Sequence, residues 1–149
     1  MPALAEREDH NISIFFAVEI DGIAEAYFTE VTGMSLKRNV VEYHEGGDNS
    51  SPRYFPGHAV QSEIVLSRGM ISSNSLFKWL YDSIESNEPV DRKSGSIILY
   101  NDNMDVIKRW NFRRAFPVSW KTRGLSTDIT KLMVESLTII HEGIELVEI

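Results

Sequence analysis

The chain has 149 residues, of which 42% are hydrophobic and 25% charged, and its 22 acidic and 15 basic residues give a formal net charge of −7. This length supports one globular domain with its own core, and we expect a single domain over residues 1–149. The acidic excess disfavours a surface that grips nucleic-acid phosphates. The chain contains no cysteine, which excludes disulfide and thiolate chemistry.

The first predicted elements form a hairpin. Residues 1–11 lack the apolar core of a signal peptide, so we expect a flexible N-terminal segment there. Apolar residues alternate from Ile12 to Ile20, Asp21-Gly22 provides a tight turn, and a second strand returns from Ile23 to Thr32. No run is apolar for long enough to span a bilayer, so we expect a soluble protein without a membrane segment.

A third strand and a long loop are predicted next. The strand runs from Ser35 to Glu45 and has apolar residues on both faces, which is typical of partial exposure or contact with a partner. Residues 46–59 carry three glycines and two prolines and predict a loop. Long loops inside compact domains are usually functional or mobile.

One helix is predicted, over residues 73–87, after a short strand from Val60 to Arg68. Ser72, Ser73 or Asn74 can cap its start, and it should stop before Pro89. One side of the helix carries apolar residues at helical spacing, and two aromatic residues flank that side; the set is Leu76, Phe77, Leu80 and Ile84, with Trp79 and Tyr81 beside them. We expect the helix to pack on a sheet.

The longest predicted strand runs from Arg109 to Lys121, after a strand from Ile97 to Tyr100 and a turn at residues 101–103. Arg114 interrupts its apolar face and Pro117 lacks an N–H, so we expect a bulge or a sheet edge there, open to pairing with another chain. The last strand runs from Met133 to His141. The candidate core anchors of the long strand and the helix are Trp110, Phe112, Phe116, Trp120 and Trp79.

About seven strands and one helix predict a mainly β protein. The spacing of the strands is typical of an antiparallel β-barrel or sandwich, and the single α-helix would pack against it.

Catalytic motifs are nearly absent. His141-Glu142 begins like the helix of a zinc protease, but Glu145 stands where the second histidine is required. Gly46-Gly47-Asp48 lacks the lysine and hydroxyl residue of a phosphate-binding loop. The four histidines, His10, His44, His58 and His141, lie on four different segments. We expect no catalytic residue, no cofactor and no metal.

Several spaced fragments resemble the tail-tube proteins of contractile phages. The resemblance is strongest to the inner-tube proteins of phage-tail-like contractile injection systems, the group similar to the phage T4 tail tube, and it runs from Ile12 to Leu146. The fragments that carry it include Val18-Glu19-Ile20-Asp21-Gly22, Glu42-Tyr43-x-Glu45-Gly46-Gly47-x-Asn49, Arg109-Trp110-Asn111-Phe112, Ala115-Phe116-Pro117 and His141-Glu142-Gly143.

The resemblance implies a tail-tube-like fold and a structural role. Copies of such a protein form homo-hexameric rings that stack into a hollow tube, the conduit for DNA or protein cargo, inside a sheath protein and between baseplate or tube-initiator and terminator proteins. It implies assembly in the bacterial cytoplasm as part of a virion or phage-tail-like particle, without specific nucleic-acid binding. The candidate inter-subunit loop comprises Glu45, Gly46, Gly47, Asp48, Asn49, Arg53, Pro56 and Gly57.

Three alternatives stay open. A tube-initiator or baseplate ring protein would share the fold and form single rings. A type VI-like hexameric carrier would bind effectors inside its ring. A small hydrolase, metal-dependent or serine-based, would rest only on scattered His, Glu and Ser residues.

Overall fold

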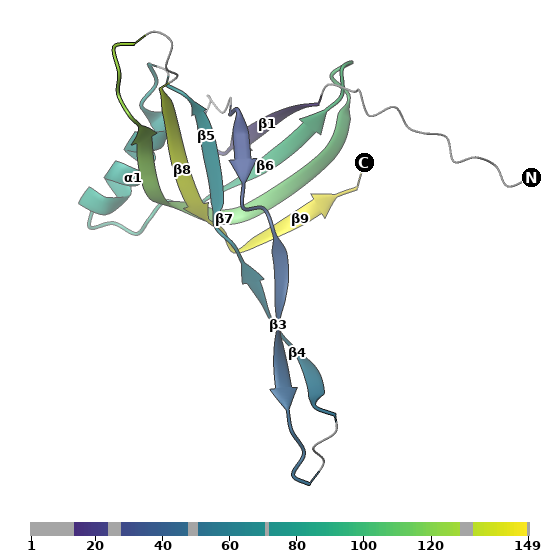
Figure 1. The fold of residues 1–149 in the computed structure, drawn as a ribbon. Coiled ribbons are helices and arrows are strands. Elements are labelled where there is room, and N and C mark those ends of the chain that lie inside the picture. Colours follow the sequence, from purple (N-terminus) through teal and green to yellow (C-terminus); the bar gives the residue numbers. More distant parts are fainter. Residues whose placement is uncertain (1–13, 24–27, 48–50, 71, 129–132, 149) are drawn as a thin grey trace, which may run out of the picture.

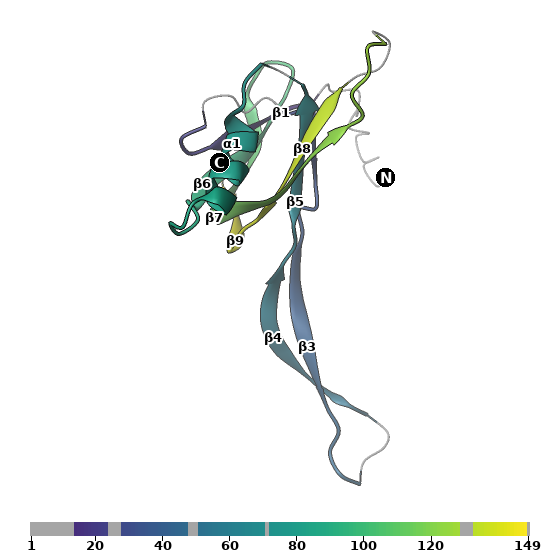
Figure 2. The same cartoon turned by 90° about the vertical axis from the view of Figure 1, so that its left-hand side faces the viewer.

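The computed structural model describes residues 14–23, 28–47, 51–70, 72–128 and 133–148, and Figures 1 and 2 show the fold from two sides. All strand pairs among these residues are antiparallel, and the predicted mainly β fold with one helix is confirmed. In chain order the elements are β1 (Phe15–Ile20), β2 (Glu30–Thr32), β3 (Leu36–Tyr43), β4 (Arg53–Gln61), β5 (Ile64–Gly69), α1 (Ser75–Glu85), β6 (Lys93–Tyr100), β7 (Val106–Arg123), β8 (Val134–Ile140) and β9 (Gly143–Val147).

Seven strands form one curled sheet, in the order β1-β6-β7-β8-β5-β2 with β9 also on β7. The 18-residue β7 joins the two halves of this sheet. Its first half pairs with β6 on one side and β9 on the other, and its second half pairs with β8. β8 and β9 follow one another along the same side of β7, because Phe116 pairs with Ile140 and Arg113 pairs with Gly143.

The predicted bulge in β7 is confirmed. Arg114 has a φ of 50°, a left-handed conformation that side chains rarely adopt, and the register with β8 shifts between Pro117 and Ser119. These irregularities change which side chains face inward, so that Phe112, Ala115 and Pro117 are buried while Val118 is exposed. A strict alternation over residues 109–121 would place Phe112, Phe116 and Val118 on one face of the sheet, and this alternation fails after Phe112.

The predicted hairpin of residues 12–32 is confirmed only at its turn, where Ile20 and Ile23 form an antiparallel bridge, and its residues 12, 13 and 24–27 lie outside the described residues. The turn forms as expected, with Gly22 at a φ of 78° and the Ile23 N–H donating to the Ile20 carbonyl. However, β1 pairs with β6, and β2 pairs with β5. Local alternation identifies a strand but not its partner, which depends on where the strand can bury its apolar side chains.

The core lies between the two halves of the sheet and α1. It is a single cluster formed by Val18, Ile20, Phe28, Ile64, Leu66, Leu76, Trp79, Ile97, Phe112, Ala115, Leu137 and Ile139. The helix begins two residues later and ends two residues earlier than predicted. Among its described side chains, Leu76 and Trp79 are buried, whereas Phe77 is 43% and Ile84 68% exposed.

The predicted inward face of α1 is therefore right at Leu76 and wrong at Phe77 and Ile84. The Trp79 ring faces the core and its Nε1–H donates to the Asp91 carbonyl at 3.0 Å, which satisfies the one polar atom of this large apolar group.

No helix among the described residues is long and apolar enough to cross a membrane.

The strands β3 and β4 form a separate two-stranded sheet that projects away from the curled sheet (Figures 1 and 2). The predicted loop of residues 46–59 is thus wrong from Arg53 onward, because those residues belong to β4. Proline is tolerated in strands at edges and bulges, and Pro56 lies next to the register shift between Arg38 and Val40. Gly57 lies against Asn39, where a Cβ would come within 2.7 Å of the Asn39 carbonyl oxygen.

Candidate inter-subunit surfaces

The β3–β4 hairpin exposes apolar side chains on both of its faces. Leu36 is 72% exposed, and the other exposed large apolar side chains of the hairpin are Val40, Val41, Tyr43, Tyr54, Phe55 and Val60. Val41 pairs with Phe55 and the neighbouring Val40 pairs with Pro56, so apolar groups occur on opposite faces. An isolated two-stranded hairpin is marginally stable in water, and an exposed apolar surface of this kind marks an interaction site.

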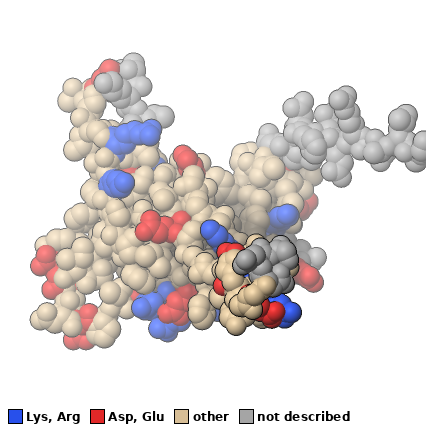
Figure 3. All heavy atoms as spheres, turned by 60° about the horizontal axis from the view of Figure 1, so that its bottom comes forward, with Lys and Arg blue, Asp and Glu red and all other residues tan. Residues whose placement is uncertain are grey.

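The tip of the hairpin carries a histidine–carboxylate contact and an ion pair close to solvent. Glu42 contacts His44 at 3.1 Å, and Glu45 contacts Arg53 at 3.3 Å. Viewed from the hairpin end, Lys and Arg are interspersed with Asp and Glu over the face, so neither sign dominates it (Figure 3). Pairs exposed to this degree contribute little stability.

The root of the hairpin is closely packed. Gly33 has a φ of 85°, and a Cβ there would come within 2.0 Å of the Glu63 carbonyl oxygen. The Ser62 hydroxyl donates to the Gly33 carbonyl at 2.5 Å, and the Ser35 hydroxyl donates to Ser62 Oγ at 2.7 Å. These contacts fix where the hairpin leaves the body of the protein.

The predicted inter-subunit residues that the structure describes all lie on this hairpin. Glu45, Gly46 and Gly47 lie at the turn, and Arg53, Pro56 and Gly57 lie on β4. Asp48 and Asn49 lie outside the described residues. Whether these residues contact another subunit stays a prediction.

The predicted core anchors divide into three groups. Phe112 and Trp79 belong to the core cluster, and Trp110 and Trp120 are partly buried against it. Phe116 lies outside this cluster, with the Arg92 guanidinium 4.7 Å from the centre of its ring. The bulge at Arg114 explains this difference, because it shifts the alternation of side chains along β7, so that Phe116 does not face the core as Phe112 does.

Among the described residues, the outer edges of β1 and β9 have no strand partner. Two further free edges bound the four strands β7, β8, β5 and β2. One is the outer edge of β2, the last strand in the order of the sheet. The other is the edge of β7 from Phe116 to Arg123 that faces away from β8, because the ladder with β6 ends at Ala115. In Figure 1 these edges lie on opposite sides of the four strands β7, β8, β5 and β2. Unpaired edges are templates for pairing with another chain.

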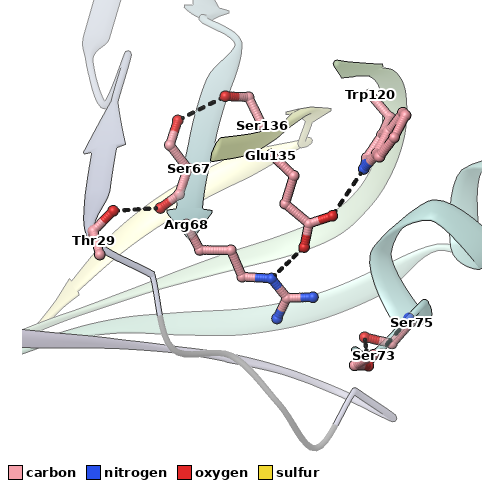
Figure 4. Close-up of polar contacts among 8 residues, drawn as sticks. All are labelled: Thr29, Ser67, Arg68, Ser73, Ser75, Trp120, Glu135 and Ser136. Carbon is pink, nitrogen blue, oxygen red and sulfur yellow. Dashed lines mark hydrogen bonds and ion pairs between the residues drawn. The ribbon is translucent and has the colours of Figure 1, made fainter. Parts of the chain in front are cut away.

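The outward face of these four strands is rich in hydroxyl groups. Two rows cross it from strand to strand, namely Glu30, Ser67, Ser136 and Lys121, and Thr32, Val65, Thr138 and Ser119. The Ser67 and Ser136 hydroxyls lie 2.9 Å apart (Figure 4). Charged side chains in these two rows occur only at the two edges, at Glu30 and Lys121.

A buried ion pair lies on the opposite, inward face. The Arg68 Nε donates to Glu135 Oε1 at 2.5 Å, and the Trp120 Nε1–H donates to Glu135 Oε2 at 3.2 Å (Figure 4). The Arg68 guanidinium also lies 5.6 Å from the centre of the Phe28 ring. This network links β5, β8 and β7 beside the helix.

An aromatic cluster lies where α1 meets the unpaired edge of β7. The Phe77 ring packs edge-on against Trp120 with centroids 4.9 Å apart, and it stacks on Tyr81 at 5.6 Å. A cavity of about 310 Å³ opens beside them, lined by Met70, Ser73, Asn74, Phe77, Trp120 and Glu135. Among the residues that the structure describes, no three His, Asp or Glu side chains gather closely enough to hold a metal ion.

A family model, described as the T4-like virus tail tube protein gp19, matches residues 12–145. The chain belongs to this family. Comparison with curated protein sequences gave no match. The tail-tube resemblance inferred from the spaced fragments is therefore confirmed over nearly the whole chain.

Solved structures with the same fold include chains of an extracellular contractile injection system and of the anti-feeding prophage. The chain is similar to one in the extended sheath–tube complex of an extracellular contractile injection system called PVC, at 26% identity and a TM-score of 0.76, over 90% of this chain and 88% of that one. A chain of the anti-feeding prophage baseplate is 20% identical with a TM-score of 0.72, over 99% and 96%. Hcp1 from Flavobacterium johnsoniae shares the fold at 16% identity and a TM-score of 0.55, over 88% and 93%.

The protein is therefore a structural tube protein of contractile tails and injection systems, and not an enzyme. Sequence reasoning did not single out the Arg68–Glu135 pair or the edge residues Glu30 and Lys121. A signal for the pair exists, because Arg68 continues the inward alternation of Ile64 and Leu66, and Glu135 begins that of Leu137 and Ile139.

Proposed function

We propose that this protein is the protomer of a hollow inner tube, in which hexameric rings stack to form a conduit for DNA or protein cargo. The observation that carries the proposal is the pair of unpaired strand edges on opposite sides of the strands β7, β8, β5 and β2. Two different edges on one protomer favour a head-to-tail contact, and such contacts close into rings when the rotation between copies allows it. The number six is what the family resemblance implies.

The directions of the strands support such a ring. Each step from β7 to β8, β5 and β2 is antiparallel, so β2 runs opposite to β7. A second copy in the same orientation would therefore place its β7 antiparallel to β2 of the first. Each of the strands β7, β8, β5 and β2 would then have a neighbour on both sides, which removes the two exposed edges that bound them.

The projecting hairpin supports stacking. It leaves the body on one side, with apolar residues on both faces and only a short root attached (Figure 2). We infer that it packs against a neighbouring copy or the next ring, and that a sheath, a baseplate or initiator, and a terminator protein contact the tube. The PVC and anti-feeding prophage structures are of particles with sheath and tube or with a baseplate.

Negative-stain electron microscopy of the purified protein tests the proposal. We expect rings with a central hole and tubes built from them. Single rings that never elongate would favour the initiator alternative, and rings that retain a co-purified protein would favour the carrier. A protein that stays monomeric at high concentration would contradict the conduit.

A further inference from the structure

The register of the strands at the joint between neighbouring copies can be inferred from the pairing within one copy, and this inference rests on the proposed ring. Within one copy, rows of paired residues cross β2, β5, β8 and β7 from one free edge to the other. Glu30 pairs with Ser67, Ser67 with Ser136, and Ser136 with Lys121. This row therefore begins at an acidic residue on one free edge and ends at a basic residue on the other.

The two edges are also complementary in charge. Glu30, Lys121 and Arg123 are all exposed, and among the described residues none of them has an ion-pair partner. Lys121 lies on the same face of the sheet as Glu30, because the two residues end the same row. Arg123 lies on that face too, since side chains two residues apart in a strand point the same way. Opposite charges on directly opposed residues stabilise an antiparallel pair, and like charges destabilise it.

The inward side of the same edges is apolar. The next row joins Val31 through Leu66 and Leu137 to Trp120. At the edge of β7, Trp120 is backed by Phe77 and by the cavity of about 310 Å³ that both residues line. A second copy whose β2 continued the row would place its Val31 beside this aromatic cluster.

We propose that β2 of one copy pairs with residues 116–123 of β7 of the next, with Glu30 facing Lys121 on the hydroxyl-rich side and Val31 facing Trp120 on the other. Closed barrels require strands to tilt and the register to stagger. A stagger of two residues keeps each side chain on its face, and in the direction of the β7 C-terminus it brings Glu30 opposite Arg123. Both registers therefore pair an acid with a base.

Disulfide cross-linking tests this register directly, because the chain has no cysteine of its own. Directly opposed residues in an antiparallel pair have Cα atoms within the range that a disulfide spans. Glu30→Cys and Lys121→Cys are purified separately, mixed and oxidised. We expect a heterodimer band that exceeds either homodimer band, or the same result with Arg123→Cys if the register is staggered.

A matched control uses Ser136→Cys, which lies in the same row on an interior strand. Mixed with Glu30→Cys, it should give no heterodimer. A heterodimer with this control, or none with Lys121→Cys or Arg123→Cys, would overturn the proposed register.

Charge reversal gives an independent readout. Glu30→Lys and Lys121→Glu should each lose assembly in sedimentation and microscopy, because each brings like charges together. Mixing the two variants should restore assembly, because the Lys at position 30 of one variant then faces the Glu at position 121 of the other, and the unchanged edges pair as in the wild type. Arg123→Glu replaces Lys121→Glu if the cross-links show the stagger. No recovery in the mixture would overturn the charge pairing.

These outcomes test the proposed register and the proposed function independently. Wild-type rings without the cross-link would refute the register and leave the conduit intact. A monomeric wild type would refute the conduit, while a cross-link formed at high protein concentration would still support the joint.

Discussion

Glu135 is 4% exposed, and both of its oxygens accept hydrogen bonds, from Arg68 and from Trp120. A buried charge is tolerated only where it is paired and hydrogen-bonded. The pair ties three strands together at the end of the core nearest the helix. Glu135 therefore favours the arrangement in which β8 lies between β5 and β7.

Replacing Glu135 by Ala should lower the free energy of unfolding by about 3 to 5 kcal/mol, because it leaves the Arg68 guanidinium buried without its carboxylate. Chemical denaturation followed by fluorescence measures the change. Glu19→Ala is the control, since the Glu19–Arg109 pair is exposed at 3.4 Å and should contribute less than about 1 kcal/mol. Equal losses in both variants would contradict the role of the buried network.

His141 is 3% exposed at the junction of β8 and β9. Burial lowers the pKa of His141 below its ordinary value of 6.5, and nearby backbone groups of Gly143 and Ser62 oppose part of that shift. Neither ring nitrogen of His141 has a hydrogen-bond partner among the described residues. The folded protein therefore holds this histidine neutral.

The pH dependence follows from that lowered pKa. As the pH falls below 6.5, the unfolded chain takes up the proton first, so stability is lost from there down to the pKa of the folded state. We expect the unfolding free energy to fall more steeply in this window for wild type than for His141→Gln. Parallel curves from denaturation at several pH values would show that His141 is not the cause.

At the scale of elements, the hairpin depends on its root. The sequence of residues 46–59 contains the glycines and prolines of a loop, yet Arg53–Gln61 is a strand. A two-stranded hairpin has no central strand, so it accommodates Pro56 and the close approach at Gly57. Its single partner, β3, supplies the whole ladder.

Gly33→Ala should destabilise this root by about 2 kcal/mol or more, because alanine disfavours a positive φ and its Cβ would overlap the Glu63 carbonyl. Gly46→Ala is the matched control on the same hairpin, since a Cβ there meets nothing within 4 Å. Thermal melts and amide hydrogen exchange of β3 and β4 compare the two. A neutral Gly33→Ala would mean that the root adapts freely.

At the scale of the whole molecule, the protein presents two kinds of candidate contact surface. Two free strand edges lie on opposite sides of the strands β7, β8, β5 and β2, and the hairpin projects beyond the curled sheet (Figure 1). The core cluster contains no residue of β3 or β4. Folding and assembly should therefore be separable by mutation.

Deleting residues 48–53 should leave a folded protomer that fails to form tubes, because it removes the hairpin tip and the Arg53–Glu45 contact while sparing the core. Circular dichroism with a thermal melt checks the fold, and negative-stain microscopy checks assembly. Normal tubes from this variant would exclude the hairpin tip as an essential contact.

The sequence alone determined the helix, the family and most of the strands, but not β4 or β9. Alternation and turn residues located β3, β7 and the turn at Asp21-Gly22, and the spaced fragments identified the tail-tube resemblance. These features are local or depend on order along the chain, so a single sequence carries them.

Only the tertiary structure decided which strands pair, which side of α1 faces inward and where the free edges lie. β1 and β2 were expected together, but each buries its apolar side chains against a distant strand. The side of α1 that is buried depends on where the sheet lies, and the bulge at Arg114 shifts the phase of β7. Pairing, burial and edges are properties of residues far apart in the chain, and periodicity does not encode them.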